Sequence, residues 1–190
     1  MKNIRKIYIG SDHAGFELKK EIIKFLEKAE YEVIDHGAYE YDEDDDYPKY
    51  VSACAGALSS DIYTGKKNGF GIVFGGSGEG EAIVAGKYKG IRAGVINSEN
   101  LELVKLLREH NNANIISFGA RFISEEFAKQ AIRTFLLTKF DEADEAVVTR
   151  HERRIEQIED LEENIDTKVT KTELDELDSL ASMRAEVSDN

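Results

Sequence analysis

One glycine-rich segment of the sequence carries the residue types needed for proton transfer. Residues 75–81 (GGSGEGE) follow an apolar stretch and precede a stretch of helical pattern, so their backbone N–H groups can converge on an anion. Glu81 stands where a dinucleotide-binding loop needs its third glycine, and the Gly-Lys-Ser/Thr ending of a P-loop is missing. The segment instead suits a reaction that passes through an oxyanion, which Ser77 and the loop amides would hold while Glu81 moves a proton. A glutamate in a first helical turn is also ordinary, so both interpretations stay open here.

Three other clusters of polar residues have a chemical and a plain structural interpretation. Asp12 and His13 follow the first apolar segment, where an N-cap and a surface histidine are the alternative. Residues 109–114 (EHNNAN) end a predicted helix, and a simple polar turn is the alternative. Arg150 and Arg154 lie four apart, so on a helix they share one face. That face is either a phosphate clamp or a solvated surface.

The elements that must position these residues alternate between short apolar segments and longer stretches of helical period, which is typical of a parallel sheet covered by helices. The pattern predicts strands near 4–10, 31–36, 69–75, 91–96 and 113–119, and helices near 15–29, 47–60, 80–88, 98–110 and 124–138. We therefore predict an α/β, Rossmann-like three-layer fold with a five-stranded parallel sheet. Ligands of such sheets bind beyond the carboxyl ends of the strands. Asp12, residues 75–81 and Arg121 each follow a predicted strand and are expected to meet there.

The chain is expected to form one domain with an appendage. Its 190 residues, 41% of them hydrophobic, suffice for one sizeable core, which we assign to residues 1–154. Residues 155–190 carry 12 Asp/Glu against 3 Lys/Arg, so this segment accounts for most of the net charge of −13. Apolar residues recur at helical spacing from Ile155, and residues 170–173 form a capping box. We predict an acidic extension of two helices.

Composition also excludes several classes of partner. An acidic chain without a basic patch disfavours nucleic acid and anionic membrane surfaces, and no apolar run reaches the roughly 20 residues of a membrane span. Cys54 is the single cysteine, and the N-terminus lacks the apolar stretch of a signal peptide, so we expect a soluble cytoplasmic protein. Cys54 itself lies in an apolar stretch and is predicted to be a buried structural thiol. Residues 42–46 (DEDDD) resemble a metal site, but a solvated loop before a helix that begins at Pro48 is the favoured interpretation.

A series of motifs, taken in chain order, resembles one family of enzymes. The motifs are residues 10–16 (GSDHAGF), 46–48 (DYP), 76–81 (GSGEGE), Lys87 with 90–93 (GIRA), 110–111 (HN), 119–121 (GAR) and 150–154 (RHERR). Over about residues 4–158 the chain resembles the type B ribose-5-phosphate isomerases and the related galactose-6-phosphate isomerase subunits. The resemblance implies an aldose-ketose isomerase that interconverts ribose 5-phosphate and ribulose 5-phosphate through an enediolate. A galactose-6-phosphate or allose-6-phosphate isomerase, or a non-catalytic phosphosugar-binding subunit, stays open.

The resemblance also implies a role for each matching residue. Many relatives carry a catalytic cysteine where this chain has Gly75, and another branch uses a glutamate at the position of Glu81. Glu81 is thereby implied as the base, and Ser77 with the amides of Gly76, Gly78 and Gly80 as the anion hole. The remaining implied roles are ring opening for Asp12 and His110, a hydroxyl contact for Asn111, phosphate binding for His13, Arg121, Arg150 and Arg154, and a pocket wall for Tyr47. The family implies a small phosphorylated sugar as ligand, no metal or organic cofactor, and a homodimer or tetramer in which some phosphate ligands come from the neighbouring subunit.

Glu79 departs from the family pattern, because its position in the glycine loop is usually neutral. Two outcomes are open for this carboxylate. It either raises the pKa of Glu81 by like-charge repulsion or points to solvent.

Overall fold

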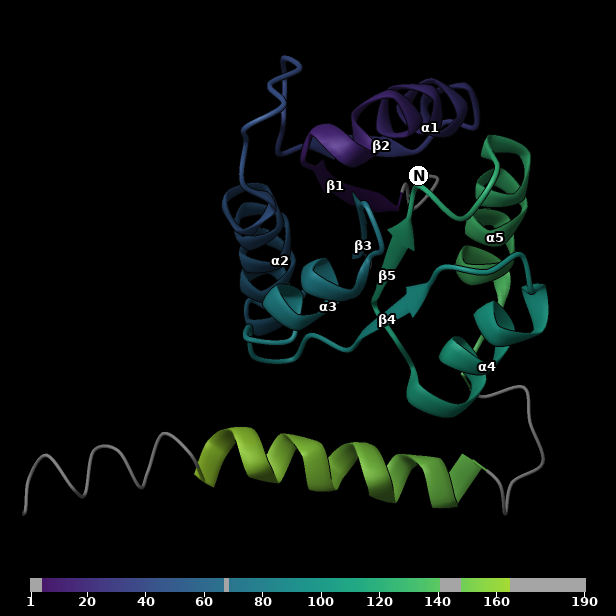
Figure 1. Cartoon of the computed structure of the whole chain (residues 1–190). Helices are drawn as coiled ribbons and strands as arrows, with labels where there is room; N and C mark the ends of the chain where they lie inside the picture. Colours follow the sequence, from purple (N-terminus) through teal and green to yellow (C-terminus); the bar gives the residue numbers. More distant parts are fainter. Residues whose placement is uncertain (1–4, 67–68, 141–147, 165–190) are drawn as a thin grey trace, which may run out of the picture. The chain divides into compact units, whose positions relative to one another are not determined.

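A computed structural model of the chain describes residues 5–66, 69–140 and 148–164 (Figure 1). Five parallel strands form one sheet in the order β2-β1-β3-β5-β4. The strands are β1 (Lys6–Ser11), β2 (Glu32–Asp35), β3 (Gly69–Gly75), β4 (Ala93–Ile96) and β5 (Ile115–Gly119). Ser11 pairs with Phe74 and Gly75 pairs with Gly119, so β1, β3 and β5 end at the same edge of the sheet. The α/β fold and the five predicted strands are confirmed.

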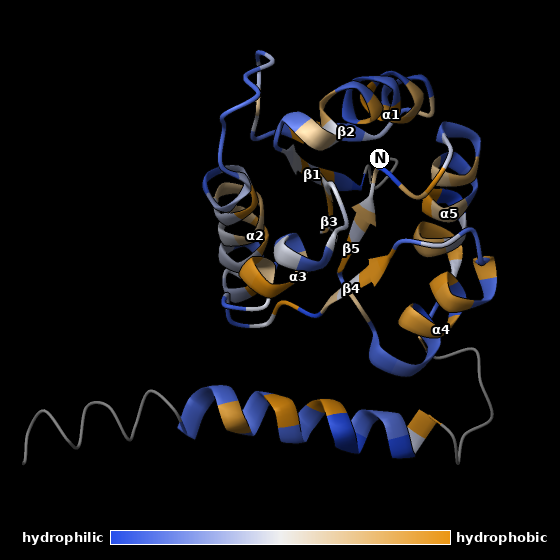
Figure 2. Ribbon diagram, viewed as in Figure 1, coloured by the Kyte–Doolittle hydropathy of each residue, from blue (hydrophilic) through white to orange (hydrophobic). Residues whose placement is uncertain are grey.

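Helices cover both faces of the sheet. They are α1 (Phe16–Lys28), α2 (Tyr47–Tyr63), α3 (Glu79–Ala85), α4 (Leu101–Asn111) and α5 (Glu125–Leu137), and the short 3-10 helix η1 (His13–Gly15) precedes α1. One apolar core lies between the sheet and α1, α4 and α5, and a second lies between the sheet and α2 and α3. Figure 2 shows the apolar residues gathered on the strands and on the side of α5 that faces them. The three-layer arrangement predicted from the sequence is therefore present.

Local sequence explains where several helices begin. The side chain of Asn100 accepts a hydrogen bond from the backbone N–H of Glu102 at the start of α4, and Ser124 does the same for Phe127 in α5. Pro48 lies in the first turn of α2, as predicted, where its missing N–H costs nothing. These caps fix the starts of helices whose apolar faces then pack on the sheet.

Cys54 belongs to the second core. Its side chain is fully buried on α2, and burial raises its thiol pKa to about 12. A thiol that stays protonated in an apolar environment is neither a nucleophile nor a metal ligand at neutral pH. The prediction that Cys54 is a buried thiol is confirmed.

The chain divides into two compact units, Met1–Val148 and Thr149–Asn190. Residues 148–164 are helical. The predicted division into domains 1–154 and 155–190 stays a prediction, and the predicted second helix of the extension lies outside the described residues. No helix within the described ranges has the length and apolar character needed to cross a membrane.

Candidate active site

A cavity of about 460 Å³ lies at the edge where β1, β3 and β5 end. Its lining comes from the segments that follow these strands and from the starts of α2 and α3: Asp12, His13, Ala14, Tyr47, Gly76, Ser77, Gly80, Glu81, Arg121 and Phe122. Eight residues predicted from the sequence are in that lining. A larger cavity, of about 570 Å³, is lined only by residues of α1 and α5 and by the adjacent Ala29, and holds none of the predicted residues. The smaller cavity is therefore the candidate active site.

Glu81 is the buried carboxylate of this cavity, with only 3% of its surface exposed. It lies in the first turn of α3, and its side chain fills the space beside Gly75. A Cβ atom at Gly75 would lie 1.7 Å from Oε1 of Glu81, so any larger residue at position 75 collides with the carboxylate. The observed position of the Glu81 carboxylate therefore requires glycine at position 75, and a cysteine at 75 is incompatible with it.

The environment of Glu81 raises the pKa of its carboxyl group. Burial is the main cause, the negative charge of Asp12 adds to it, and hydrogen bonds from the backbone N–H groups of Glu81 and Gly78 oppose it in part. Glu79 is not among the causes. Its exposed carboxylate accepts a hydrogen bond of 3.0 Å from the side-chain amide of Asn97. The exposed side chain of Glu79 agrees with the second of the two outcomes considered for it. A raised pKa suits a group that must both take up and release a proton near neutral pH.

The glycine loop is held against the end of β5. Gly78 has a φ of 81°, a left-handed conformation that favours glycine, and its carbonyl oxygen accepts a hydrogen bond of 2.6 Å from the hydroxyl of Ser117. At Gly80 the phenol of Tyr47 approaches closely, because an added Cβ would lie 2.6 Å from its hydroxyl oxygen. The loop therefore presents its backbone and Ser77 to the cavity from a fixed position.

Arg121 brings positive charge to the same cavity. The guanidinium carbon would lie 3.2 Å from a Cβ placed on Gly76, so the side chain extends along the glycine loop. The backbone N–H of Arg121 donates to the carbonyl oxygen of Gly76 at 3.3 Å, which joins the end of β5 to the loop. Arg121 is exposed, as a group that binds a ligand's anion must be before the ligand arrives.

Asp12 and His13 form the opposite wall. Asp12 is 6% exposed, and its carboxylate accepts a hydrogen bond of 3.0 Å from the backbone N–H of Ala14, so it caps η1 and lines the cavity at once. Burial raises the pKa of Asp12. The structural and chemical interpretations of this residue are thus compatible.

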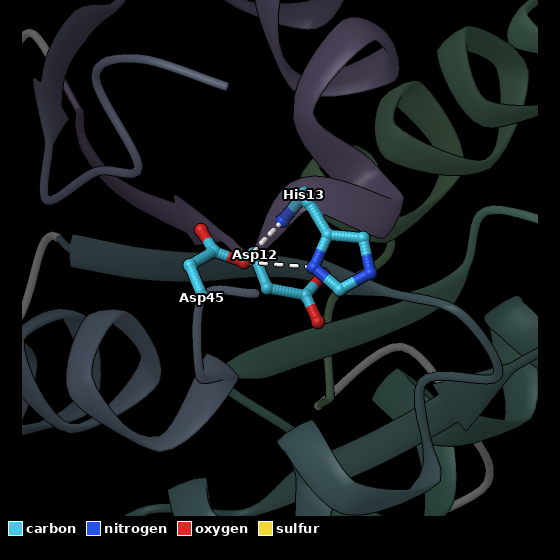
Figure 3. Close-up of side chains that lie close together, drawn as sticks. All are labelled: Asp12, His13 and Asp45. Carbon is cyan, nitrogen blue, oxygen red and sulfur yellow. Dashed lines mark hydrogen bonds and ion pairs between the residues drawn. The ribbon is translucent and has the colours of Figure 1, made fainter. Parts of the chain in front are cut away.

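Asp45 is a residue of the site that the sequence did not reveal. The predicted solvated loop is correct for residues 42–44 and for Asp46, which are exposed, but wrong for Asp45, whose side chain is 5% exposed. Its Oδ1 lies 2.8 Å from both the backbone N and the ring Nδ1 of His13 (Figure 3). Five acidic residues in a row give no sequence signal for which one turns inward.

Asp12, His13 and Asp45 also place three possible metal-ligand atoms within 4.8 Å of one another. Both carboxylates are engaged in hydrogen bonding in the structure. Oδ1 of Asp45 accepts from His13, and Oδ1 of Asp12 accepts from the backbone of η1. The hydrogen bond to Asp45 orients the histidine ring and raises its pKa, and the expectation that the site needs no metal stays a prediction.

Five predicted site residues are not in the cavity lining, and one of them, Gly78, belongs to the glycine loop itself. His110 and Asn111 are exposed at the end of α4, a few residues before β5 begins. They therefore lie toward the edge where β5 begins, whereas the cavity is at the edge where it ends. Arg150 and Arg154 are exposed on the helix of the second unit. His110 and Asn111 are therefore not among the residues that line the described cavity.

A Rossmann-like sheet that carries a buried, elevated-pKa glutamate, a glycine loop and an arginine at its carboxyl edge is the framework of an acid-base enzyme for small anionic substrates. Residues 7–158 match the model of the Ribose/Galactose Isomerase family, and the chain belongs to this family.

Curated relatives and solved structures agree with this membership. Ribose-5-phosphate isomerase B of Mycolicibacterium paratuberculosis is 42% identical over 151 residues, which cover 80% of this chain and 87% of the relative. The Escherichia coli protein of the same name is 38% identical over 153 residues, covering 80% and 93%. The crystal structure of ribose-5-phosphate isomerase B from Mycoplasma genitalium with bound ribulose-5-phosphate matches with a TM-score of 0.74 and 32% identity, over 83% of this chain and 96% of that chain.

Proposed function

We propose that this chain is a ribose-5-phosphate isomerase that interconverts ribose 5-phosphate and ribulose 5-phosphate, with Glu81 as the base. The observation that carries the proposal is the buried carboxylate of Glu81, which occupies the space that Gly75 leaves open inside the cavity. The names of the relatives supply the substrate, and the ligand of the Mycoplasma genitalium structure is the product of the same reaction.

The proposed reaction moves one proton between neighbouring carbons. In the open-chain aldose, Glu81 removes the proton from C2, and the electrons of the broken C–H bond form the C1–C2 double bond of an enediolate, whose negative charge resides on O1. Ser77 and the amides of Gly76, Gly78 and Gly80 stabilise that charge. Glu81 then returns its proton to C1, while a proton moves from O2 to O1, and the ketose results. The same carboxyl group accepts a proton from C2 and donates a proton to C1, so the proposed step uses no metal or organic cofactor.

Asp12 is assigned to ring opening, together with His110. A buried carboxyl group with a raised pKa exchanges protons readily with a sugar hydroxyl near neutral pH. Asp12 and Glu81 share one cavity, and the charge of Asp12 contributes to the raised pKa of Glu81. Ring opening and isomerisation are thereby coupled through two carboxyl groups in one site.

The phosphate group is assigned to His13 and Arg121 from one chain and to Arg150 and Arg154. His13 and Arg121 line the cavity that contains Glu81. They hold a part of the substrate that does not react, and the binding energy orients the sugar for proton transfer. Tyr47, whose hydroxyl lies against the loop at Gly80, forms the wall of the pocket.

We further propose a homodimer as the working unit, in the cytoplasm. The support is that His110 and Asn111 lie toward the edge of the sheet opposite the cavity, so a second copy would supply them. Exposed apolar side chains support an interface as well: Ile83 on α3, and Ile158 and Leu161 on the helix of residues 148–164, are 64%, 45% and 63% exposed. The single cysteine of the chain fits a reducing compartment.

A side-by-side assay tests which sugar phosphate is the substrate. Purified protein is incubated with ribose 5-phosphate, galactose 6-phosphate and allose 6-phosphate at equal concentrations, and the initial rate of ketose formation is measured for each. The proposal predicts the highest kcat/KM for ribose 5-phosphate. A higher value for either hexose phosphate would assign the chain to the hexose branch, and no turnover of any of the three would make it a binding subunit.

A further inference from the structure

Asp45 is the one carboxylate of the acidic run 42–46 whose side chain the structure describes as buried. An ionised carboxylate removed from water is costly unless it is paired. Its Oδ1 accepts two hydrogen bonds from His13, and the hydroxyl of Tyr50 also interacts with the carboxylate. The two hydrogen bonds from His13 therefore contribute to making the burial of Asp45 tolerable.

The two hydrogen bonds determine the state of the histidine ring. One is donated by the backbone N–H of His13, and the other by ring Nδ1, which must carry a proton to donate to a carboxylate. Figure 3 shows ring Nε2 on the side away from Asp45. Since His13 lines the cavity, Nε2 is the ring nitrogen left for a ligand.

We infer that Asp45 is a positioning residue for phosphate recognition: it holds His13 with Nδ1 protonated and keeps the imidazolium charge available to the substrate phosphate through Nε2. The inference rests on the proposed function, which places the phosphate at His13. It adds the reason why this histidine is charged when the substrate binds. A carboxylate, histidine and phosphate then form a chain in which each hydrogen bond is charge-assisted.

The charges around His13 favour its protonated form. Its pKa is raised chiefly by the hydrogen bond to Asp45, and the neighbouring carboxylate of Asp12 adds to this effect. The ring of Tyr41, from the same loop as Asp45, contacts the imidazole edge-on at 6.4 Å between centroids. Tyr50 of α2 faces Asp45, and burial and that carboxylate raise the pKa of Tyr50.

Other groups that line the cavity also contribute to the electrostatic potential at His13. Glu81 from α3 is a third carboxyl group, Arg121 after β5 is a cation, and Tyr47 from α2 also lines the cavity. Asp45 is the one among these neighbours that makes a direct hydrogen bond to the ring. Removing its charge is thus expected to lower the pKa of His13 more than any change at a more distant group.

A pH profile follows from this arrangement. A phosphate monoester gains its second negative charge at a pH of about 6, so binding rises through that pH. A His13 with a raised pKa keeps its positive charge as the pH rises and loses it on passing the folded-state pKa. Phosphate binding is therefore strongest between these two limits, and Asp45 sets the upper one.

The test compares Asp45→Asn with Asp44→Asn. Asparagine keeps the shape of the side chain and an acceptor for both His13 donors, but it removes the charge. Asp44→Asn makes the same charge change one residue away, on an exposed side chain. The first measurement is the ring titration of His13, followed by ¹⁵N NMR in the full-length protein. We expect Nδ1 protonated and a raised pKa in the wild type and in Asp44→Asn, and a clearly lower pKa in Asp45→Asn.

The second measurement is competitive inhibition by inorganic phosphate, with ribose 5-phosphate as substrate, between pH 5.5 and 8.5. A charge-assisted hydrogen bond contributes about 1.5 kcal/mol or more, so Asp45→Asn is expected to raise the inhibition constant roughly tenfold at pH 7.5 and much less at pH 5.5. The upper limb of the profile moves to lower pH, and kcat changes less than KM. A wild-type profile for Asp44→Asn is the matched control.

The outcomes separate this inference from the proposed function. An unchanged His13 pKa in a folded Asp45→Asn protein, or a loss of phosphate affinity equal at all pH values, overturns the positioning role. Absence of ribose 5-phosphate turnover by the wild type overturns the proposed function instead, whereas the NMR titration still reports on Asp45 and His13. The wild-type spectrum alone is decisive if Asp45→Asn fails to fold, because a proton on Nε2 and not on Nδ1 contradicts the inference.

Discussion

Replacing Gly75 by alanine tests whether Glu81 works from the position that the structure gives it. The added Cβ would lie 1.7 Å from Oε1, 2.1 Å from Cδ and 2.5 Å from Oε2 of Glu81. Non-bonded heavy atoms need about 3.5 Å, so the carboxylate must move by more than 1 Å. A displacement of about 1 Å costs on the order of 10²-fold in rate, and complete loss of a general base costs up to about 10⁴-fold. We therefore expect kcat of Gly75→Ala to fall by about 10² to 10⁴.

The assay is the initial rate of ribulose 5-phosphate formation, with substrate binding measured in parallel by calorimetry. Gly86→Ala is the matched control, because Gly86 ends α3 at a φ of −67° and an added Cβ meets no atom closer than 3.4 Å. The double variant Gly75→Ala/Glu81→Gln should lose no more activity than Glu81→Gln alone, since both changes remove the same function. Wild-type kcat in a folded Gly75→Ala protein would refute the placement of the base.

Three further predictions concern phosphate, the dimer and the cysteine. Arg121→Ala and Arg154→Ala should each lower kcat/KM for ribose 5-phosphate by an amount that corresponds to about 2–5 kcal/mol of lost transition-state stabilisation. Both variants should hardly change the slow turnover of free ribose. Equal losses with both substrates would show that the arginines have a structural role. Mixing Glu81→Gln with His110→Ala under proven subunit exchange should restore about one quarter of wild-type activity, because half of the two-fold dimers then hold one intact site. No recovery would place His110 and Glu81 in the same subunit's site. Cys54→Ala should keep its kcat, and a large loss would show that the thiol takes part in the reaction.

The framework of the fold was predictable because it depends on apolar periodicity. Continuous apolar segments such as residues 69–75 read as buried parallel strands, and the five strands lie close to their predicted ranges. The placement of Asp12, Glu81 and Arg121 at one edge followed from the rule that parallel strands end together. These predictions needed only local pattern and topology.

Other features of the site depend on packing that no local pattern encodes. The sequence showed glycine at 75, but the reason for it, the space taken by Glu81, is visible only in three dimensions. The acidic run 42–46 hid Asp45, because chemically similar neighbours do not reveal which one folds inward. His110 matched a family motif, yet α4 carries it toward the edge of the sheet where β5 begins.

Proton transfer by Glu81 is most directly measured with ribose 5-phosphate in D₂O, followed by ¹H NMR. The wild type should form ribulose 5-phosphate and incorporate solvent deuterium at C1, because the proton held by Glu81 exchanges with solvent before it is returned. Glu81→Gln should bind the sugar phosphate but form ketose and incorporate deuterium at rates at least about 10²-fold lower. Isomerisation and exchange at wild-type rates in Glu81→Gln would contradict the assignment of Glu81 as the base.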